Sequence, residues 1–411
     1  MFEFGRDLRK LFDKARESED LGWVELIGAD LLQAEARRES IDAGRVSCAR
    51  PFETERRAGA LWREHARRTG AGDSLDRAER AAESLSRAAG SDDQRVLAAI
   101  DRAQVLLLRF DLCGDPGRLA AALEALASAG PTRRGWVAAE AAAAQALIQA
   151  RQARLSGQAD ALHEASVALD AAVRAAEAKG LPNADDLKLE RAALALEIGV
   201  LTRDSRMLDR AGRDLSALAE TFSPDRRPLS RARVLGLCGA GLSALAAAAG
   251  HPEAQAQGRM MFQAAAEQFT PDHSPLDWAA IQVAQAGEGD GPLMPLVQAE
   301  ALTQGQGLVL GALARERRLA REIALAAEVG DRAGLDQIET RLRDRLPAAG
   351  KAPLDWVADQ LGMARLTLAR RTVGKTAPQA LALGLLEAEA VARESGALVL
   401  AERAAGLRAR A

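Results

Sequence analysis

The strongest hint of chemistry in this sequence is the stretch RRTVGKTAP at residues 370–378. Its Gly374, Lys375 and Thr376 match the end of a phosphate-binding loop, in which backbone N–H groups and the lysine hold nucleotide phosphates. That loop also needs a glycine at position 369, where this chain has Ala369, and no strand pattern precedes it. The stretch therefore predicts a turn after a helix and not a nucleotide site.

Histidines and cysteines, the usual metal ligands and nucleophiles, are few and scattered. The histidines are His65, His163, His251 and His273, and the cysteines are Cys48, Cys113 and Cys238. His163 and Glu164 begin a zinc-binding HExxH motif, but position 167 is Val167. No cysteine pair has metal-ligand or disulfide-framework spacing, and no Gly-x-Ser-x-Gly elbow is present. We expect no metal, no cofactor and no enzyme activity.

The composition indicates an all-α protein. Alanine dominates, tyrosine is absent, and the long Val/Ile/Thr alternations of strands are missing. A formal net charge of −3 argues against a general nucleic-acid binder, which needs excess Lys and Arg. The N-terminus does not resemble a secretory signal, and no stretch of 18 residues is apolar and free of charge. We expect a cytoplasmic protein without a membrane span.

Two patterns recur at long intervals and predict the elements of the chain. The first is a helical stripe, Leu-x-x-Ala-x-x-x-Leu, whose copies begin at residues 75, 119, 162, 208, 255, 335 and 381. In three copies an Asp stands one turn earlier: Asp115, Asp204 and Asp331. A carboxylate suits the start of a helix, where it accepts hydrogen bonds from free N–H groups.

The second pattern is a proline that opens a further helical stretch. It appears in FSPDRRPLSRA from Phe222, FTPDHSPLDWA from Phe269 and PLDWVADQ from Pro353. The prolines of this series are Pro131, Pro182, Pro228, Pro275 and Pro353. Proline fits the first turn of a helix because its missing N–H is not needed there. Together the patterns predict helix pairs, the first helix opened by Pro and the second by Asp, with a repeat of about 43 to 51 residues.

A single helix pair cannot bury its apolar face, so such pairs stack into an array with capped ends. We therefore expect an α-solenoid of antiparallel helix pairs. Residues 1–50 would form an N-terminal helical cap, 51–285 a helical-repeat array, 286–330 an inserted or diverged helical segment, and 331–411 C-terminal helical repeats and a cap. The third segment reflects a doubled interval between 255 and 335, which contains the helix breaker GEGDGP at 287–292. Either an insertion or a unit without the signature would explain it.

The phrases PLDWAAIQ, from Pro275, and PLDWVADQ, from Pro353, resemble the Pro-Leu-Asp-Trp-Ala repeats of bacterial tetratricopeptide-like (TPR) proteins. CGAGLSALAAAAG at 238–250 is similar to the usual continuation, with Gly239 at the glycine position. The asparagine pair that normally follows the phrase is absent, and the tyrosine of the general signature cannot occur in this chain. The resemblance implies a right-handed superhelix whose concave groove usually holds a partner protein or peptide.

Two further features fit such an array. Tryptophans in predicted first helices are expected to fill gaps between repeats; these are Trp62, Trp136, Trp278 and Trp356. The run LARERRLARE at 313–322 predicts an exposed helix with i,i+4 ion pairs, and a patch for an acidic partner is the alternative.

The N-terminal residues leave three interpretations open. Bulky apolar side chains lie among basic ones: Phe2, Phe4, Leu8, Leu11 and Phe12. A second helix is expected from about Leu21 to Ser40. The segment could seal the first repeat as a cap, which solenoid ends require. It could instead contact a membrane surface peripherally, or act as a dimerisation or partner helix in a homo-oligomer.

The leading hypothesis is a non-catalytic adaptor or scaffold that binds a protein or peptide partner through its concave surface. A ligand- or peptide-sensing regulatory solenoid, hinged at GEGDGP, is the alternative. From their register in the predicted first helices, the candidate partner-binding residues are Gln145, Arg233, Gln282, Asp359 and Gln360.

Overall fold

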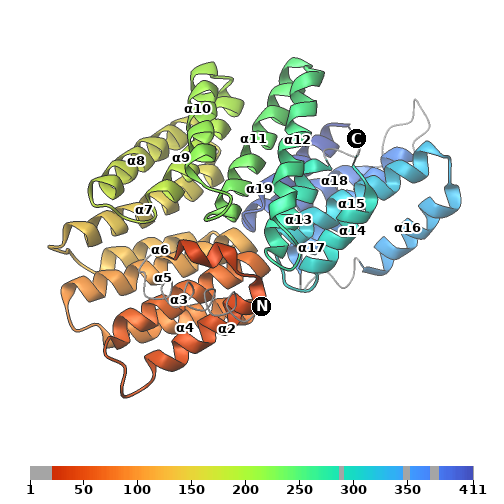
Figure 1. The fold of residues 1–411 in the computed structure, drawn as a ribbon. Coiled ribbons are helices and arrows are strands. Elements are labelled where there is room, and N and C mark those ends of the chain that lie inside the picture. The colour runs from red at the N-terminus through yellow and green to blue at the C-terminus, as the bar shows by residue number, and fades with distance from the viewer. Residues whose placement is uncertain (1–20, 287–290, 346–351, 371–378, 411) are drawn as a thin grey trace, which may run out of the picture.

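The computed structural model describes residues 21–286, 291–345, 352–370 and 379–410, and every regular element in these ranges is a helix (Figure 1). The all-α prediction is confirmed for them. The elements are η1 (Gly22–Leu26), α2 (Ala29–Ala43), α3 (Pro51–Thr69), α4 (Gly72–Ala88), α5 (Asp92–Cys113), α6 (Gly117–Ser128), α7 (Gly135–Ser156), α8 (Ala159–Ala178), α9 (Ala184–Thr202), α10 (Ser205–Thr221), α11 (Pro228–Ala249), α12 (Pro252–Gln268), α13 (Pro275–Gln285), α14 (Leu293–Thr303), α15 (Val309–Glu328), α16 (Arg332–Arg345), α17 (Pro353–Ala369), α18 (Gln379–Glu394) and α19 (Leu398–Arg410).

The proline pattern marks some helix starts correctly and misses others. Helices α11, α13 and α17 begin at their predicted prolines, and Pro51 and Pro252 open α3 and α12 in the same way. The prediction is wrong for Pro131 and Pro182, which lie in the loops before α7 and α9. Between Pro131 and α7, the hydroxyl of Thr132 accepts a hydrogen bond from the Arg134 amide at 3.2 Å, so a turn precedes the helix.

The aspartates that were expected at helix starts lie there. Asp204 caps α10, because its carboxylate accepts a hydrogen bond from the Arg206 amide at 2.9 Å. Asp331 accepts from the Gly334 amide in the first turn of α16, and Asp115 from the Gly117 amide at the start of α6. In each case a free N–H group of the first turn gains an acceptor.

Each described helix packs against its neighbours along the chain, and the apolar core is divided accordingly. One cluster joins α7, α8 and α9, another joins α11, α12 and α13, and a third joins α17, α18 and α19. Two helices, α14 and α15, lie in the interval where the sequence patterns fail, so the succession of helices continues there. This sequential packing is compatible with an α-solenoid.

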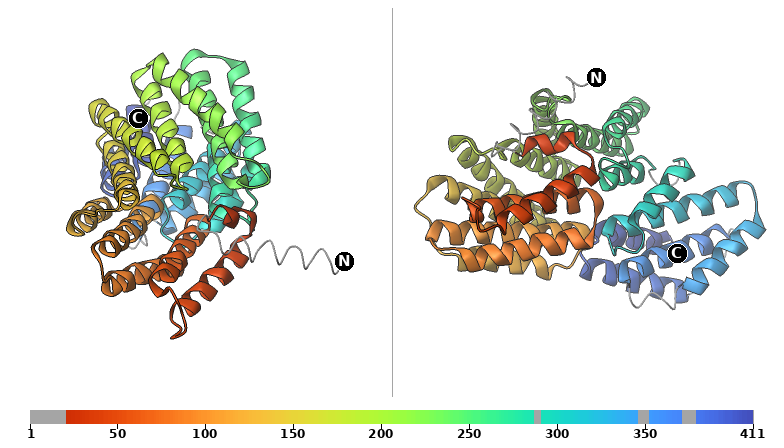
Figure 2. Two further views of the ribbon diagram at one scale, coloured as in Figure 1. Left: turned by 60° about the vertical axis from the view of Figure 1, so that its left-hand side comes forward. Right: turned by 60° about the horizontal axis from the view of Figure 1, so that its bottom comes forward.

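The chain curves until its first helices meet much later ones (Figures 1 and 2). Helix α3 packs against α13, and α5 packs against α15. Further along, the Asp115 amide after α5 donates a hydrogen bond to the Ser395 carbonyl, between α18 and α19, at 3.3 Å. The described helices therefore close around an interior space.

Two local predictions need correction. The helix expected from about Leu21 to Ser40 is interrupted, because extended backbone at Ile27 and Gly28 separates η1 from α2. The LARERRLARE run is not an exposed helix, since Arg315, Glu316 and Arg318 are all buried.

The charges of this run are paired inside the molecule. Glu316 binds Arg365 of α17 and Arg403 of α19, and Arg318 binds Glu300 and Glu322. These groups are therefore not displayed to an acidic partner.

Three sequence features lie outside the described residues: the apolar N-terminal segment within 1–20, most of GEGDGP, and the Gly374-Lys375-Thr376 tripeptide.

Candidate functional site

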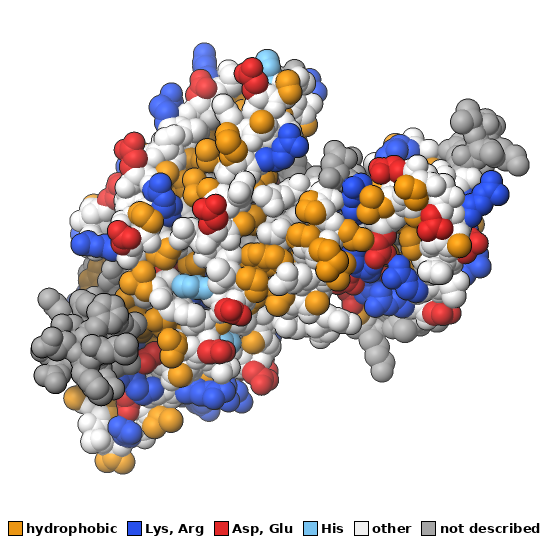
Figure 3. All heavy atoms as spheres, turned by 45° about the vertical axis from the view of Figure 1, so that its right-hand side comes forward, with side chains coloured by type: hydrophobic (Ala, Val, Ile, Leu, Met, Phe, Trp, Pro, Cys, Tyr) orange, Lys and Arg blue, Asp and Glu red, His pale blue; other side chains and the backbone are white. Residues whose placement is uncertain are grey.

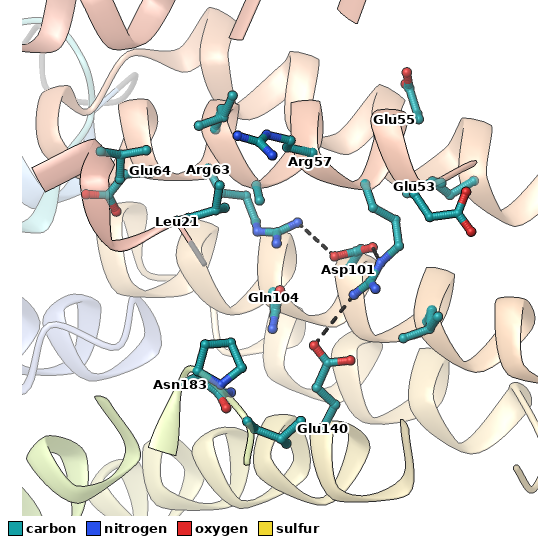
Figure 4. Close-up of a pocket in the computed structure, with 18 of the residues that line it drawn as sticks. Leu21, Glu53, Glu55, Arg57, Arg63, Glu64, Asp101, Gln104, Glu140 and Asn183 are labelled. Carbon is teal, nitrogen blue, oxygen red and sulfur yellow. Dashed lines mark hydrogen bonds and ion pairs between the residues drawn. The ribbon is translucent and has the colours of Figure 1, made fainter. Parts of the chain in front are cut away.

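The described part of the chain has a cavity of about 2180 Å³ inside the curve of the helices (Figure 4). Its walls come mainly from the odd-numbered helices α3, α5, α7 and α9, with η1, α2, α4, α11 and α13 contributing further residues. Twelve acidic and ten basic side chains line it, together with leucines and Trp136. Its surface is therefore nearly balanced in charge and partly apolar.

A stripe of arginines on α3 meets one buried carboxylate on α5. Arg56, Arg63 and Arg67 are spaced i, i+7 and i+11, which places them on one face of the helix. Arg56 Nε lies 2.8 Å from Asp101 Oδ2, and Arg63 Nη1 lies 3.2 Å from Oδ1. Asp101 is only 2% exposed, and a charge this deep is tolerated because both of its oxygens accept hydrogen bonds.

Two buried side-chain oxygens lie beside this cluster. Arg56 reaches Glu140 of α7 only at 3.7 Å, and Glu140 Oε2 is a buried atom without a hydrogen-bond partner in the described structure. Burial therefore raises the pKa of Glu140 more than Arg56 lowers it. Asn183 Oδ1, from the loop before α9, is likewise buried and unpartnered. Gln104 of α5 projects between Asp101 and these two groups (Figure 4).

A second ionic cluster joins α5, α7 and α9. Arg151 Nε lies 3.0 Å from Asp111 Oδ1, and Arg151 Nη1 lies 2.6 Å from Glu190 Oε2. Burial alone would raise the pKa of Glu190, but Arg151 and Arg154 lower it to about 2. Glu190 therefore stays ionised at neutral pH.

A third cluster lies where α3 meets α13. Arg67 Nη1 lies 2.9 Å from Asp277 Oδ2, and Arg233 Nη2 lies 3.4 Å from the same oxygen. Burial opposes ionisation, yet the two arginines lower the pKa of Asp277 to about 2. Arg67 also binds Glu64 on its own helix at 2.8 Å. This cluster connects residues that are 210 positions apart.

The structure separates the residues that the sequence put forward as partner-binding. Arg233 lines the cavity. Gln145 is exposed on α7 but lies off the cavity wall, and Gln282 is half-buried on α13, also off the wall. Their roles stay predictions.

The two candidates on α17 lie far from the cavity lining. Asp359 is 2% exposed, and its Oδ1 is 2.9 Å from Arg315 Nε without hydrogen-bond alignment. The side-chain oxygen of Gln360 faces Gly384 of α18. These side chains therefore contact neighbouring helices.

Sequence reasoning missed most of the cavity residues, although two signals were present. The i, i+7, i+11 spacing of arginines on α3 marks a charged face on a helix that also buries Trp62. Asp101 is the one acidic residue in the apolar run VLAAIDRAQVLLL, and an isolated carboxylate there predicts a buried partner.

Among the described residues, no group of three or more His, Cys, Asp or Glu side chains is placed to hold a metal ion. One helix is long and apolar enough to cross a membrane by length and composition alone, the stretch Pro228–Ala248 within α11, 33% of which is buried in this fold. Core helices of soluble proteins pass the same test.

Comparison with known proteins gives no relative: no protein-family model and no curated protein matches the chain.

Proposed function

We propose that this chain is a TPR-like α-solenoid of antiparallel helix pairs that acts as a non-catalytic adaptor or scaffold. It binds a protein partner through its concave surface, which is the wall of the cavity described above. The observation that carries the proposal is the cavity itself, of about 2180 Å³ and lined by successive odd-numbered helices.

The size of the cavity favours a polypeptide over a small molecule. Sites for small ligands usually measure roughly 300–1,000 Å³, so this cavity is larger than the whole of that range. An extended segment of a partner protein is large enough to occupy this cavity on its own. A cytoplasmic protein partner also fits the near balance of acidic and basic side chains, whereas nucleic acid would need a basic wall.

The chemistry of the wall fits the same occupant. Glu140 Oε2 and Asn183 Oδ1 lack donors, and Gln104 stands beside them. A peptide backbone supplies an N–H donor at nearly every residue, and the leucines of the wall would contact its apolar side chains. A bound segment would thus reduce the cost of the unpartnered acceptors, about 1–3 kcal/mol for each such buried group.

The alternative is a regulatory solenoid that senses a peptide or another ligand. The contact of α3 with α13 favours it, because a closed chain around a cavity can change shape when the cavity fills. Capture of a peptide or small molecule, in place of a stoichiometric protein, would support this alternative.

The test combines affinity capture with a matched pair of substitutions. Gln104→Trp adds bulk inside the cavity, while Gln257→Trp adds the same side chain to an exposed site on α12 outside it. Tagged wild type and both variants are used to capture proteins from cell extract, with gentle and high-salt washes and identification by mass spectrometry. We expect a near-stoichiometric partner with wild type and Gln257→Trp, and its loss with Gln104→Trp. Equal capture by both folded variants would rule out the cavity as the binding site.

A further inference from the structure

One of the contacts that close the chain, between its N-terminal helices and the segment from α11 to α13, is rich in hydrogen bonds and ion pairs. We call it the closure seam and define it by eight residues. Glu25, Ala29 and Arg67 lie on the N-terminal side; Arg227, Ser230, Asp272, His273 and Asp277 lie on the other.

Glu25 is the central residue of the seam. It is 5% exposed and belongs to η1, yet its hydrogen-bond partners lie about α11, more than 200 positions away. Its Oε1 accepts from Arg227 Nε at 2.7 Å, and its Oε2 accepts from the Ser230 backbone amide at 2.8 Å. The Ser230 hydroxyl donates to the same carboxylate. A buried carboxylate with this many donors is stable only while η1 and α11 stay together.

The loop before α13 and the first turn of α13 add three more polar contacts. His273 Nε2 lies 2.8 Å from the Glu25 backbone carbonyl, and the Ala29 amide donates to the Asp272 carbonyl at 3.3 Å. The third is the ion pair between Arg67 and Asp277 at 2.9 Å. Polar groups thus connect this region to η1, α2 and α3.

The apolar clusters do not cross the seam. The cluster around Trp62 joins residues 21–105 alone, and the cluster around Phe262 joins residues 229–281 alone. None of the clusters found in the described residues contains side chains from both sides of the seam. Neighbouring helices along the chain are held by apolar burial. The seam has a smaller apolar contact, where Leu276 and Leu308 pack against Gly70 at the end of α3, and its other contacts are made by groups that water and salt can also satisfy.

The seam also forms part of the cavity wall, since Glu25, Arg67, Arg227 and Asp277 all line the cavity. Separation of the two sides would therefore widen the cavity at this part of its wall. Apolar packing within each side would remain intact.

We propose that the closure seam is a releasable electrostatic clasp whose opening admits a polypeptide segment to the cavity. The admission of a segment rests on the proposed function. The clasp itself does not, because it is a property of the protein alone. Polar contacts of this kind resemble the interfaces between domains that move relative to one another.

The first experiment measures closure without any partner. The double variant Glu25→Gln and Arg67→Gln removes the two charges that the N-terminal side contributes to the seam and leaves a neutral polar side chain at each position. We expect small-angle scattering to show a larger radius of gyration than wild type, with unchanged helical circular dichroism. Wild type should expand likewise at about 1 M salt, where the screening length falls to ~3 Å.

The control is Arg154→Gln, because Arg154 pairs with Glu197 between α7 and α9, away from the seam, and is similarly exposed. This variant should keep the wild-type dimensions. If the double variant loses helicity, Glu25→Gln alone is measured by hydrogen exchange at the Ser230 amide, which should become faster. Unchanged scattering of the folded double variant, or unchanged Ser230 exchange in the single variant, overturns the clasp.

The second experiment measures access to the cavity. In a background with the three native cysteines replaced by serine, Gln104→Cys places a thiol on the cavity wall. A bulky polyethylene-glycol maleimide should label it faster in the seam variant, by about tenfold if the open form gains about 1.4 kcal/mol. Met260→Cys, at an exposed site on α12, should label equally in both backgrounds.

Equal labelling at position 104 in both backgrounds would show that the clasp does not gate the cavity. Expansion of the seam variant without any captured partner would count against the proposed function alone.

Discussion

Gly114 offers a steric test of the second place where the chain meets itself. It ends α5 with φ 81° and ψ −143°, a backbone conformation that is nearly confined to glycine. A Cβ at this position would lie 2.0 Å from the Ser395 carbonyl oxygen, between α18 and α19. Because that obstacle is backbone, it cannot rotate away as a side chain would.

The loss of stability in a Gly114→Ala variant has two sources, the strained backbone conformation and the overlap of the new Cβ with Ser395. The backbone conformation alone costs an alanine about 1–3 kcal/mol. To reach an ordinary contact of 3.4 Å, the two loops must also separate by more than 1 Å. Such a shift breaks the hydrogen bond from the Asp115 amide to the Ser395 carbonyl, worth about 0.5–1.5 kcal/mol. We expect Gly114→Ala to lower the free energy of unfolding by about 2–4 kcal/mol.

Gly130→Ala is the matched control, because Gly130 has φ 78° but no atom would lie within 4 Å of its Cβ. Chemical denaturation should show the smaller loss for this variant, about 1–2 kcal/mol for a left-handed alanine. Hydrogen exchange is the deciding assay. It should become faster at Asp115 and around Ser395 in Gly114→Ala alone. Equal exchange there in both variants would refute the contact between these loops.

Two further predictions concern titration and buried charge. Burial and the neighbouring Arg68 lower the pKa of His273, so the folded chain favours the neutral ring. The free energy of unfolding should therefore fall as the pH drops below about 6.5. His273→Gln should weaken this dependence, measured by urea titrations at pH 7.5 and 5.5. Glu316 is 1% exposed and binds Arg365 and Arg403. Glu316→Ala should therefore destabilise the C-terminal helices by about 3–5 kcal/mol. Thermal unfolding like that of wild type would contradict the internal pairing.

Local structure was predictable from the sequence where short-range chemistry decides it. Pro275 begins a helix because it needs no N–H donor in the first turn, and Asp204 caps one because its carboxylate accepts a nearby amide. Pro182 was placed wrongly, since a turn after the proline delays the helix to Ala184. Such a delay depends on a few loop residues that no periodic pattern records.

The cavity and the seam were not predictable, because their contacts join distant residues. Asp277 lies in the first turn of α13, a place that suits a carboxylate for local reasons. That it also binds Arg67, 210 positions earlier, depends on how far the array curves. Small rotations between successive repeats accumulate into this curvature. For the same reason, the four candidates Gln145, Gln282, Asp359 and Gln360 do not share one surface with Arg233.

The two related phrases, FSPDRRPLSRA and FTPDHSPLDWA, combine a constant and a variable part. Phe222 and Phe269 are equivalent, and both side chains are buried at the ends of α10 and α12. These shared residues hold each loop at the same place relative to its own helices. The residues that differ between the phrases, Arg227 in the first and His273 in the second, both reach Glu25 of η1.

The residues that recur between the phrases and the residues that differ therefore have separate structural roles. Apolar positions that recur between phrases stack one helix on the next, and every copy must keep them because each unit is stabilised by its neighbours. Polar positions that vary between the phrases make the seam contacts, where Arg227 meets the Glu25 carboxylate and His273 meets the Glu25 backbone carbonyl. A chain built this way can change its closing contacts without disturbing its stacked core, which is the separation that the seam substitutions exploit.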